Sequence, residues 1–230
     1  MLIYSLIPAR SGSKRIKNKN LLKLNGKSLL EISIQQSIKT KEISKTFVST
    51  DSKIYQKISI KAGAEAPFLR KKSISKDLST DLECFKDFLK QLKKLKITQP
   101  DLIVHIRPTY PLREKNLISS CIKKFLHQKN IDSLRSVYLI KKNIQKMWLM
   151  NNKNLLFNPI TSANENHSAP GQKLKKTYIQ ANCIDILKVK NTVLRNSMTG
   201  KKIYGYKISH NFDIDEIADL KRLEKLNFKF

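Results

Sequence analysis

Cysteine is scarce in this chain of 230 residues and provides no covalent framework. The three cysteines, Cys84, Cys121 and Cys183, are odd in number and far apart in the sequence. They match neither a disulfide scaffold nor the paired spacing of a zinc site. Unpaired cysteines are typical of a reducing compartment, so we expect a cytoplasmic protein.

Long apolar runs are also missing. The apolar part of the N-terminal stretch MLIYSLIPAR is too short for a signal peptide. No apolar stretch reaches the length of about 18 residues that a membrane-spanning helix needs. We therefore expect a soluble intracellular protein without a membrane partner.

Acidic residues are few, and this gives the chain an unusual charge. Asp and Glu number 18 against 46 Lys and Arg, for a formal net charge of +28. Such an excess is typical of proteins that bind nucleic acid or anionic surfaces. The lysines are scattered over every segment, however, and the aromatic residues, 7% of the total, do not alternate with them as in base-stacking platforms. A basic nucleic-acid-binding protein is therefore the less favoured alternative, and no nucleic-acid partner is expected.

Several well-known catalytic signatures are absent. The sequence contains neither G-x-x-x-x-G-K-[ST] nor G-x-G-x-x-G. The four histidines have no metal-ligand or triad spacing, and no Ser/His or Cys/His pair indicates covalent catalysis. His105 lies in an apolar run and is interpreted as a core residue whose hydrogen bonds are satisfied.

The chain does contain a regular alternation of short apolar runs and helical patterns. Strands are expected over 2–7, 45–50, 66–69, 101–107 and 133–138, and helices over 28–38, 53–62, 82–95 and 114–126. Ordered structure is expected to resume over 177–189 and 202–208, with a final helix after 211–220. This alternation predicts an α/β fold with a doubly wound, mostly parallel sheet. The weakly periodic stretch 141–180 is interpreted as an excursion, a lid or a dimerisation arm, within one domain of residues 1–230.

In a sheet of this kind, ligands bind at the carboxyl ends of the strands. The segments that follow predicted strands are 10–20, 49–51, 70–80, 107–113 and 213–219. Most of the distinctive polar sequence falls in these segments. That placement favours an enzyme acting on small molecules over a charged structural protein.

The first of these segments, PARSGSKRIKNKN, has the composition of an anion-binding loop. Gly12 permits a tight turn, and its neighbours Ser11 and Ser13 offer hydroxyl and backbone N–H groups. Arg10 can hold phosphate oxygens in a bidentate fork, and Lys19 adds a mobile charge. Because lysine is abundant everywhere, the spacing alone leaves a solvated basic loop as an equal alternative.

The segment FDIDEIADL contains four of the scarce acidic residues within seven positions, and three of them are Asp. Asp213 and Asp215 are two apart, so in an extended segment they point the same way and can share a hard cation. The alternative is that one of them caps the last helix. The spacing leaves both interpretations open.

Five segments together carry a resemblance to a known family: IPARSGSKRIKNKN, VSTDS, SKDLSTDLE, RPTYPLR and FDIDEIADL. In this order and spacing they resemble the acylneuraminate cytidylyltransferases, the CMP-sialic acid synthetases, over nearly the whole chain. The related CMP-KDO synthetases share IPAR, but they usually carry Leu-Pro-Gly-Lys where this chain has IKNKN at 16–20.

The resemblance implies a Rossmann-like nucleotidyltransferase, typically a homodimer, that serves bacterial surface-glycan assembly. Such enzymes join CTP to a nonulosonic acid, a nine-carbon 2-keto sugar acid of sialic, legionaminic or pseudaminic type, and release pyrophosphate with the help of Mg²⁺. A CMP-KDO synthetase or another sugar nucleotidyltransferase remains the alternative within the enzymes.

The resemblance also implies roles for individual residues. Arg10 and Lys19 would grip the triphosphate and stabilise its charge during catalysis. The nucleotide would be bound by Ser11, Gly12, Ser13, Lys14, Asn20, Arg70, Ser79 and Thr80, and the metal by Asp213 and Asp215. The sugar would be bound by Gln172, Tyr178 and Asn182.

This chain departs from the family pattern at three places. Arg107 stands where the sialic-acid members often have a Gln that contacts the base, and an Arg can still donate to a pyrimidine carbonyl. Gly171-Gln172 replaces an Arg-Gln pair, and Asn182-Cys183 replaces Asn-Gly. Tyr178 and the segment CIDIL, with Asp185, look closer to members acting on legionaminic-type sugars.

Overall fold

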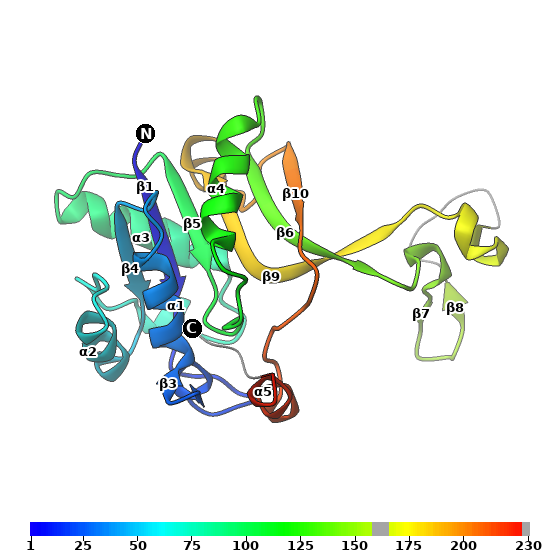
Figure 1. Cartoon of the computed structure of the whole chain (residues 1–230), viewed down its shortest axis with the longest axis horizontal. Helices are drawn as coiled ribbons and strands as arrows, with labels where there is room; N and C mark the ends of the chain where they lie inside the picture. Colours follow the sequence, from blue (N-terminus) through cyan, green and yellow to red (C-terminus); the bar gives the residue numbers. More distant parts are fainter. Residues whose placement is uncertain (158–165, 227–230) are drawn as a thin grey trace.

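A six-stranded sheet organises the chain in a computed structural model that describes residues 1–157 and 166–226 (Figure 1). Its strands are β1 (Ile3–Pro8), β4 (Lys45–Ser49), β5 (Leu102–Ile106), β6 (Ser133–Ile140), β9 (Thr177–Lys188) and β10 (Ile203–Lys207). They lie in the order β10-β6-β9-β5-β1-β4. Only β9 pairs antiparallel, with β5 on one side and β6 on the other. The prediction of a mostly parallel sheet is confirmed.

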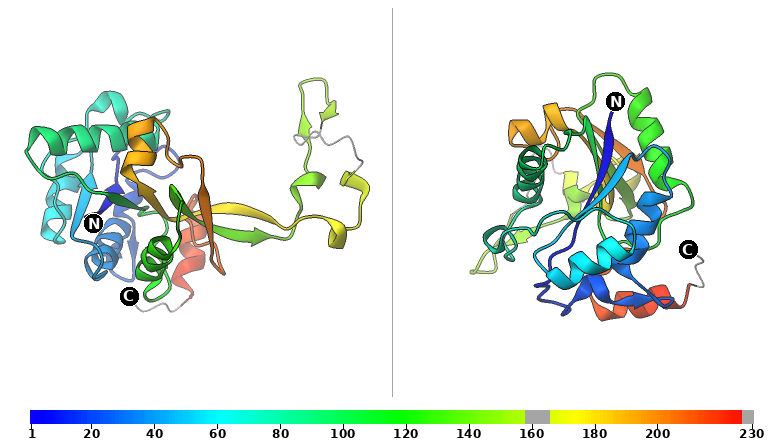
Figure 2. Two further views of the ribbon diagram at one scale, coloured as in Figure 1. Left: turned by 90° about the horizontal axis from the view of Figure 1, so that it is seen from above. Right: turned by 90° about the vertical axis from the view of Figure 1, so that its left-hand side faces the viewer.

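Helices cover both faces of this sheet, as a doubly wound fold requires (Figure 2). The long helices are α1 (Leu29–Ile38), α2 (Lys53–Lys61), α3 (Asp81–Lys94), α4 (Leu117–His127) and α5 (Ile217–Glu224). Side chains of α1, α2 and α4 pack in one apolar cluster on the sheet, and those of α3 pack in a second. A third cluster joins α5 to the basic loop and the start of α1.

Alternation along the strands explains why there are two cores. On β1, Ile3 and Ile7 contribute to the cluster with α1, whereas Tyr4 and Leu6 contribute to the cluster with α3. Successive side chains of a strand point to opposite faces, so an uninterrupted apolar run serves both cores. This is why the buried strands read as continuous hydrophobic stretches in the sequence.

The helices begin at residues that the sequence marks as caps. Ser52 caps α2, because its side chain accepts from the Tyr55 N–H. Ser28 and Thr80 cap α1 and α3 in capping boxes, in which a Glu at the third helical position accepts from the cap's backbone N–H. A two-stranded hairpin precedes α1, and its strands β2 (Lys23–Leu24) and β3 (Lys27–Ser28) are joined by an Asn-Gly turn with positive φ at both residues.

The strand predicted over 66–69 is wrong. Among the described residues, this part of the chain pairs with β4 only through an isolated bridge between Phe47 and Glu65. Pro67 follows two residues later and has no N–H to continue the ladder. The segment therefore leaves the sheet and runs on toward Arg70, whose N–H donates to Thr50.

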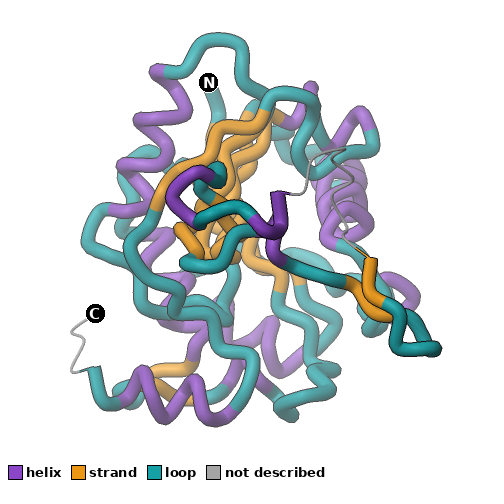
Figure 3. Tube along the Cα trace, turned by 90° about the vertical axis from the view of Figure 1, so that its right-hand side faces the viewer, coloured by secondary structure: helices purple, strands orange, loops and turns teal. Residues whose placement is uncertain are grey.

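An arm projects from one side of the molecule, where the excursion was predicted (Figures 1 and 2). Beyond the sheet, β6 and β9 continue as a two-stranded ribbon that pairs as far as Ile140 and Thr177. Near the tip lies a small hairpin of β7 (Leu149–Met150) and β8 (Leu156–Phe157), visible from the arm's side in Figure 3. Residues 158–165 of the predicted excursion lie outside the described residues.

Among the described residues, every helix is too short or too polar to cross a membrane.

Candidate active site

A cleft of about 580 Å³ opens where β1 and β5 end, at the edge of the sheet where the sequence predicted a ligand. It brings together ten of the predicted site residues: Arg10, Ser13, Lys14, Lys19, Asn20, Arg70, Ser79, Thr80, Arg107 and Asp215. It also exposes residues that were not predicted as site residues, among them Arg15, Asp77, Asp81, His105 and Thr109. Six Lys and Arg side chains against three Asp make the lining attractive to anions.

The outer cations of the cleft are held by one carboxylate. Arg10 Nη1 lies 3.1 Å from Asp77 Oδ1, and Lys14 Nζ lies 2.7 Å from Asp77 Oδ2. Arg10 also donates to the carbonyl of Lys76 at 2.6 Å. The hydrogen bond from Lys14 lowers the pKa of Asp77, so Asp77 is a counterion for both cations. It occupies the position at which an anionic ligand would meet them.

Lys19 joins the basic loop to the C-terminal segment. Its Nζ donates to the carbonyl of Ile214 at 2.7 Å and lies 3.4 Å from Asp215 Oδ1. Only 12% of the Lys19 side chain is exposed, so its charge is directed into the site. The buried Asn20 braces the loop, because its Nδ2 donates to the carbonyl of Arg10 at 3.1 Å.

Two predicted loop residues do not line the cleft. Ser11 donates from its N–H and its hydroxyl to Asp51, at 2.8 and 3.1 Å. Gly12 does not have the positive φ of a left-handed turn, and the space around a Cβ there is open. The backbone at position 12 therefore does not use the conformational freedom of glycine, and Ser11 anchors the loop to the end of β4.

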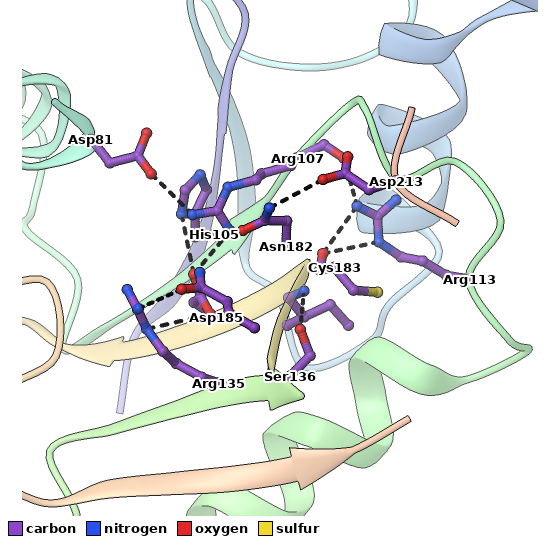
Figure 4. Close-up of polar contacts among 12 residues, drawn as sticks. Asp81, His105, Arg107, Arg113, Arg135, Ser136, Asn182, Cys183, Asp185 and Asp213 are labelled. Atoms are coloured by element: carbon purple, nitrogen blue, oxygen red, sulfur yellow. Dashed lines mark hydrogen bonds and ion pairs between the residues drawn. The ribbon is translucent and has the colours of Figure 1, made fainter. Parts of the chain in front are cut away.

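A cluster of charged residues, drawn in Figure 4, includes Arg107 and Asp81 of the cleft lining. Arg107 donates from Nη1 to Asp185 Oδ2 at 2.9 Å and from Nη2 to Asp81 Oδ2 at 3.0 Å. Asp185 is 1% exposed, and its other oxygen lies 3.7 Å from Arg135 Nε. The strand register explains this arrangement, because Asp185 on β9 stands directly opposite His105 on β5 and Arg135 on β6.

His105 is buried as predicted, but its hydrogen bonding is not satisfied. Its Nδ1 has no hydrogen-bond partner among the described residues and lies 3.8 Å from Asp185. Burial, aided by the charge of Arg107, lowers the pKa of His105 to about 4. The imidazole is therefore neutral at physiological pH and faces the cleft as an uncharged ring.

Arg113 supports the loop that carries Arg107. It is 4% exposed, and its Nη2 donates to the carbonyls of Arg107 and Cys183 at 2.8 and 3.1 Å. Its Nη1 donates to Gln36 of α1 at 2.8 Å. The loop 107–113, which contains two prolines, is thus stabilised by a buried guanidinium.

The C-terminal aspartates do not cap the last helix. Glu216 is the N-cap of α5 and forms a capping box with Asp219, so the capping alternative for Asp213 and Asp215 is wrong. Asp213 accepts from Asn182 Nδ2 at 3.1 Å, while its buried Oδ1 has no hydrogen-bond partner among the described residues. Burial and the nearby charge of Asp215 raise the pKa of Asp213. These two carboxylates remain available for other chemistry.

Their donor set fits a magnesium ion in one specific way. Within the described residues, no group of three or more His, Cys, Asp or Glu could enclose a metal. Mg²⁺ is commonly held by one or two carboxylates together with substrate phosphates, rather than by an all-protein cage. The unpartnered Asp213 Oδ1 and the cleft-lining Asp215 satisfy that requirement.

Asn182 reaches Asp213 because β9 is bulged. The register of β9 against β6 shifts between Arg135 and Val137. Asn182 adopts a left-handed backbone conformation, with φ 54°, which Asn tolerates better than most residues. Bulges of this kind redirect side chains next to functional sites.

The other two predicted sugar-binding residues lie elsewhere. Gln172 is exposed in a short 3₁₀ helix of the arm (Gly171–Lys173). Tyr178 is on the ribbon, where Lys207 packs against its ring at 5.4 Å. Neither residue lines the cleft of its own chain.

The sequence reasoning missed Asp81 and Asp185 as partners of Arg107. One signal was present: Asp185 is an isolated charge in the apolar run CIDIL. A charged residue in a buried strand is almost always paired. The sequence does not show which strands lie beside the strand that carries Asp185.

Comparison with known proteins assigns the chain to a family. The family described as Cytidylyltransferase matches residues 4–229. The chain belongs to the cytidylyltransferase family. It is therefore a nucleotidyltransferase enzyme, and the cytidylyltransferase match extends over the sheet, the cleft and the arm.

Three similar proteins place this cytidylyltransferase more closely. It is 27% identical to the pseudaminic acid cytidylyltransferase of Campylobacter jejuni subsp. jejuni serotype O:23/36, over 76% of this chain and 74% of the relative. It is 31% identical to the CMP-N,N'-diacetyllegionaminic acid synthase of Legionella pneumophila, over 54% and 53%. Its fold is similar to that of a CMP:2-keto-3-deoxy-manno-octonic acid synthetase complexed with CTP, with a TM-score of 0.72, 14% identity and 98% coverage of both chains.

Proposed function

We propose that this cytidylyltransferase activates a nonulosonic acid with CTP, giving the CMP-sugar and pyrophosphate. The observation that carries the proposal is the cleft, in which cations gather at one end and mixed donors and acceptors at the other. The relatives named above act on pseudaminic and legionaminic acids. The CMP-KDO alternative has weaker support, because that likeness, at 14% identity, extends only to the fold.

The triphosphate is proposed to bind along the basic loop. Arg10, Lys14 and Lys19 contact carboxylates of the chain itself, Asp77 and Asp215, in the structure. Phosphate oxygens can take over these contacts, because an Arg fork and Lys ammonium groups bind them in the same way. Ligand binding is then an exchange of counterions, which avoids leaving these cations unpaired before CTP arrives.

Asp213 and Asp215 are proposed to hold Mg²⁺ together with the phosphates. When bound, the metal would neutralise phosphate charge and act as a Lewis acid. Asn182 orients Asp213 by donating to its Oδ2, and this leaves Oδ1 free for the ion. Lys19, which contacts Asp215, would bring a second positive charge to the same place.

The reaction itself needs positioning more than a protein nucleophile. The anomeric 2-hydroxyl of the sugar attacks the α-phosphorus of CTP in line, forming the new P–O bond as the bond to pyrophosphate breaks. Transfers of this kind depend on alignment and on stabilising phosphate charge. Arg10 and Lys19 are proposed to stabilise that charge, and no residue is nominated as general base.

The sugar site is proposed to need two chains. Asn182 donates to Asp213 of its own chain, whereas Gln172 and Tyr178 lie on the arm. The arm exposes large apolar side chains, including Trp148, Leu149 and Met150. A homodimer that covers these side chains would bring one chain's arm toward the other chain. We propose that residues 1–230 form one domain that acts in the cytoplasm.

A substrate panel tests this function. CTP, UTP and ATP are each combined with a set of 2-keto sugar acids, and pyrophosphate release is measured with and without Mg²⁺. We expect release only with CTP, Mg²⁺ and a nonulosonic acid. Turnover with 3-deoxy-manno-octulosonic acid alone would favour the alternative enzyme. DNA binding that falls steeply with salt, without any turnover, would favour the nucleic-acid binder.

A further inference from the structure

The inner end of the cleft presents a hydrogen-bond acceptor directly beside a donor. Asp81 Oδ2 accepts from Arg107 Nη2 at 3.0 Å, so its contact with the guanidinium uses one carboxylate oxygen and leaves Oδ1 outside that contact. The Asp81 side chain is 44% exposed and lines the cleft together with Arg107. A ligand in the cleft can therefore meet a carboxylate oxygen and a guanidinium edge side by side.

This pair is held rigidly from below. Asp185, which is 1% exposed, anchors the Arg107 guanidinium at 2.9 Å and is flanked by Arg135. Arg113 fixes the backbone of the same loop through the carbonyl of Arg107. A guanidinium fixed at two of its nitrogens and at its backbone cannot swing away, so the donor and the acceptor keep their relative positions.

Stability alone does not account for such a cluster. Replacing a buried ionic network with well-packed apolar residues is often neutral or stabilising, because desolvating charges is costly. Here the cost is incurred at the wall of the cleft, and it produces a carboxylate acceptor next to an oriented donor. That combination is suited to hydrogen bonding with a ligand edge that carries a donor next to an acceptor.

We infer that Asp81 selects the nucleobase: its Oδ1 accepts a hydrogen bond from the 4-amino group of cytosine while Arg107 donates to the ring acceptors beside it. The inference rests on the proposed use of CTP. Cytosine offers an amino donor next to ring acceptors, and carboxylates are established acceptors for that amino group. Uracil has a carbonyl at the same position, which would face the carboxylate of Asp81.

This arrangement favours CTP over UTP. A site built to hydrogen-bond an N–H group strongly rejects an analogue that lacks it, because the polar group of the site is left unpaired. A uracil carbonyl opposite the Asp81 carboxylate is less favourable than the absence of any group there, because the two acceptors repel each other. Asp81 should therefore contribute at least about tenfold to the preference for CTP over UTP.

The test compares Asp81→Asn and Asp81→Ala with the wild type. The nucleotides are CTP, UTP and the triphosphate of the pyrimidin-2-one riboside, which lacks the 4-amino group. In Asp81→Asn the amide oxygen stays on Arg107 and the amide N–H₂ faces the base, so kcat/KM should fall for CTP and rise for UTP. In Asp81→Ala, CTP and the pyrimidin-2-one analogue should become equivalent.

Asp101→Asn is the matched control. Asp101 is exposed at the opposite end of β5, where its side chain accepts only from the backbone N–H of Leu2 among the described residues. The same change of charge there should leave the CTP/UTP ratio unaltered. Pyrophosphate, which has no base, should bind wild type and both Asp81 variants alike, and this verifies that the variants are folded.

The outcomes separate the two claims. If the wild type uses CTP and the CTP/UTP ratio of both Asp81 variants stays within about twofold of the wild-type ratio, the role of Asp81 is refuted and the proposed function stands. If the wild type neither binds nor turns over CTP, the proposed function itself fails. A fall in pyrophosphate affinity equal to the fall in CTP affinity would assign Asp81 to phosphate binding and also overturn the inference.

Discussion

Charged side chains at the cleft are placed where their ionisation affects both folding and binding. His105 illustrates this, because it is buried, packs edge-on against Phe85 with ring centroids 4.9 Å apart, and lies between charged neighbours. Burial lowers its pKa from 6.5 to about 4. The folded protein therefore binds fewer protons at this residue than the unfolded chain does between these two pH values.

His105→Gln should make the protein less sensitive to acid. Because the folded-state pKa is depressed, the wild type loses stability as pH falls from 6.5 toward 4, by up to about 3 kcal/mol from this residue. Urea unfolding at several pH values measures the slope of the unfolding free energy. The slope should be shallower in the variant, whereas His127→Gln, at an exposed position at the end of α4, should keep the wild-type slope. Parallel slopes in all three proteins would contradict the assignment.

Asp213→Asn and Asp215→Asn should each abolish most activity without unfolding the protein. Loss of a carboxylate that we propose to hold magnesium would remove stabilisation of phosphate charge, and we expect pyrophosphate release to fall at least about a hundredfold. Circular dichroism and the melting temperature report on folding. Glu224→Gln, an exposed change of the same kind on α5, is the control. Full activity in both Asp variants would refute the metal assignment.

At the scale of elements, the two helices α1 and α2 begin with Ser caps of different quality. The Ser28 hydroxyl accepts from the Glu31 N–H at 3.2 Å, and the Glu31 carboxylate accepts from the Ser28 backbone N–H at 2.9 Å. Ser52 makes a single contact with the Tyr55 N–H at 3.4 Å. The capping box satisfies two backbone N–H groups at the N-terminus of α1, so the Ser28 cap should contribute more to the stability of the protein than the Ser52 cap.

Ser28→Ala should therefore destabilise the protein more than Ser52→Ala. We expect a loss of about 1 kcal/mol for Ser28→Ala, the usual cost of removing a good N-cap. The midpoint of urea unfolding at constant m-value gives the difference. Equal losses in the two variants would show that the difference in geometry has no energetic consequence.

At the scale of the whole molecule, the arm has too much exposed apolar surface to be explained as an isolated ribbon. Leu149 and Met150 on β7 are 51% and 63% exposed, and Leu155 and Leu156 across the hairpin are 61% and 58% exposed. Contiguous exposed apolar residues commonly mark protein interfaces. An isolated two-stranded hairpin is also marginally stable in water, so contact with a second chain would stabilise it.

Replacing both Leu149 and Met150 with Asp should convert the proposed homodimer into a monomer. Two charges at the centre of an apolar interface cannot be paired there, and their desolvation opposes association. Sedimentation velocity distinguishes the two states. Ile60→Asp, at a similarly exposed position on α2, should remain a dimer like the wild type. A wild type that sediments as a monomer at all concentrations would refute the proposed homodimer.

Much of the site could be anticipated because its residues follow the ends of predicted strands. Arg10, Lys19 and Asn20 after β1 do lie at the cleft, as does Arg107 after β5. Contacts between distant segments could not be anticipated in the same way. Asp77 reaches Arg10 across more than sixty positions, and Asn182 reaches Asp213 only because of a bulge in β9.

The sequence by itself determined the alternation of strands and helices, the caps and the basic loop, because each depends on neighbours within one turn or one strand. The tertiary structure alone decided which charges meet. Inserting β9 antiparallel between β5 and β6 sets Asp185 opposite His105 and Arg135, and beneath Arg107. Strand order is a property of the whole packed sheet, since it depends on how every layer is covered, and no local pattern encodes it.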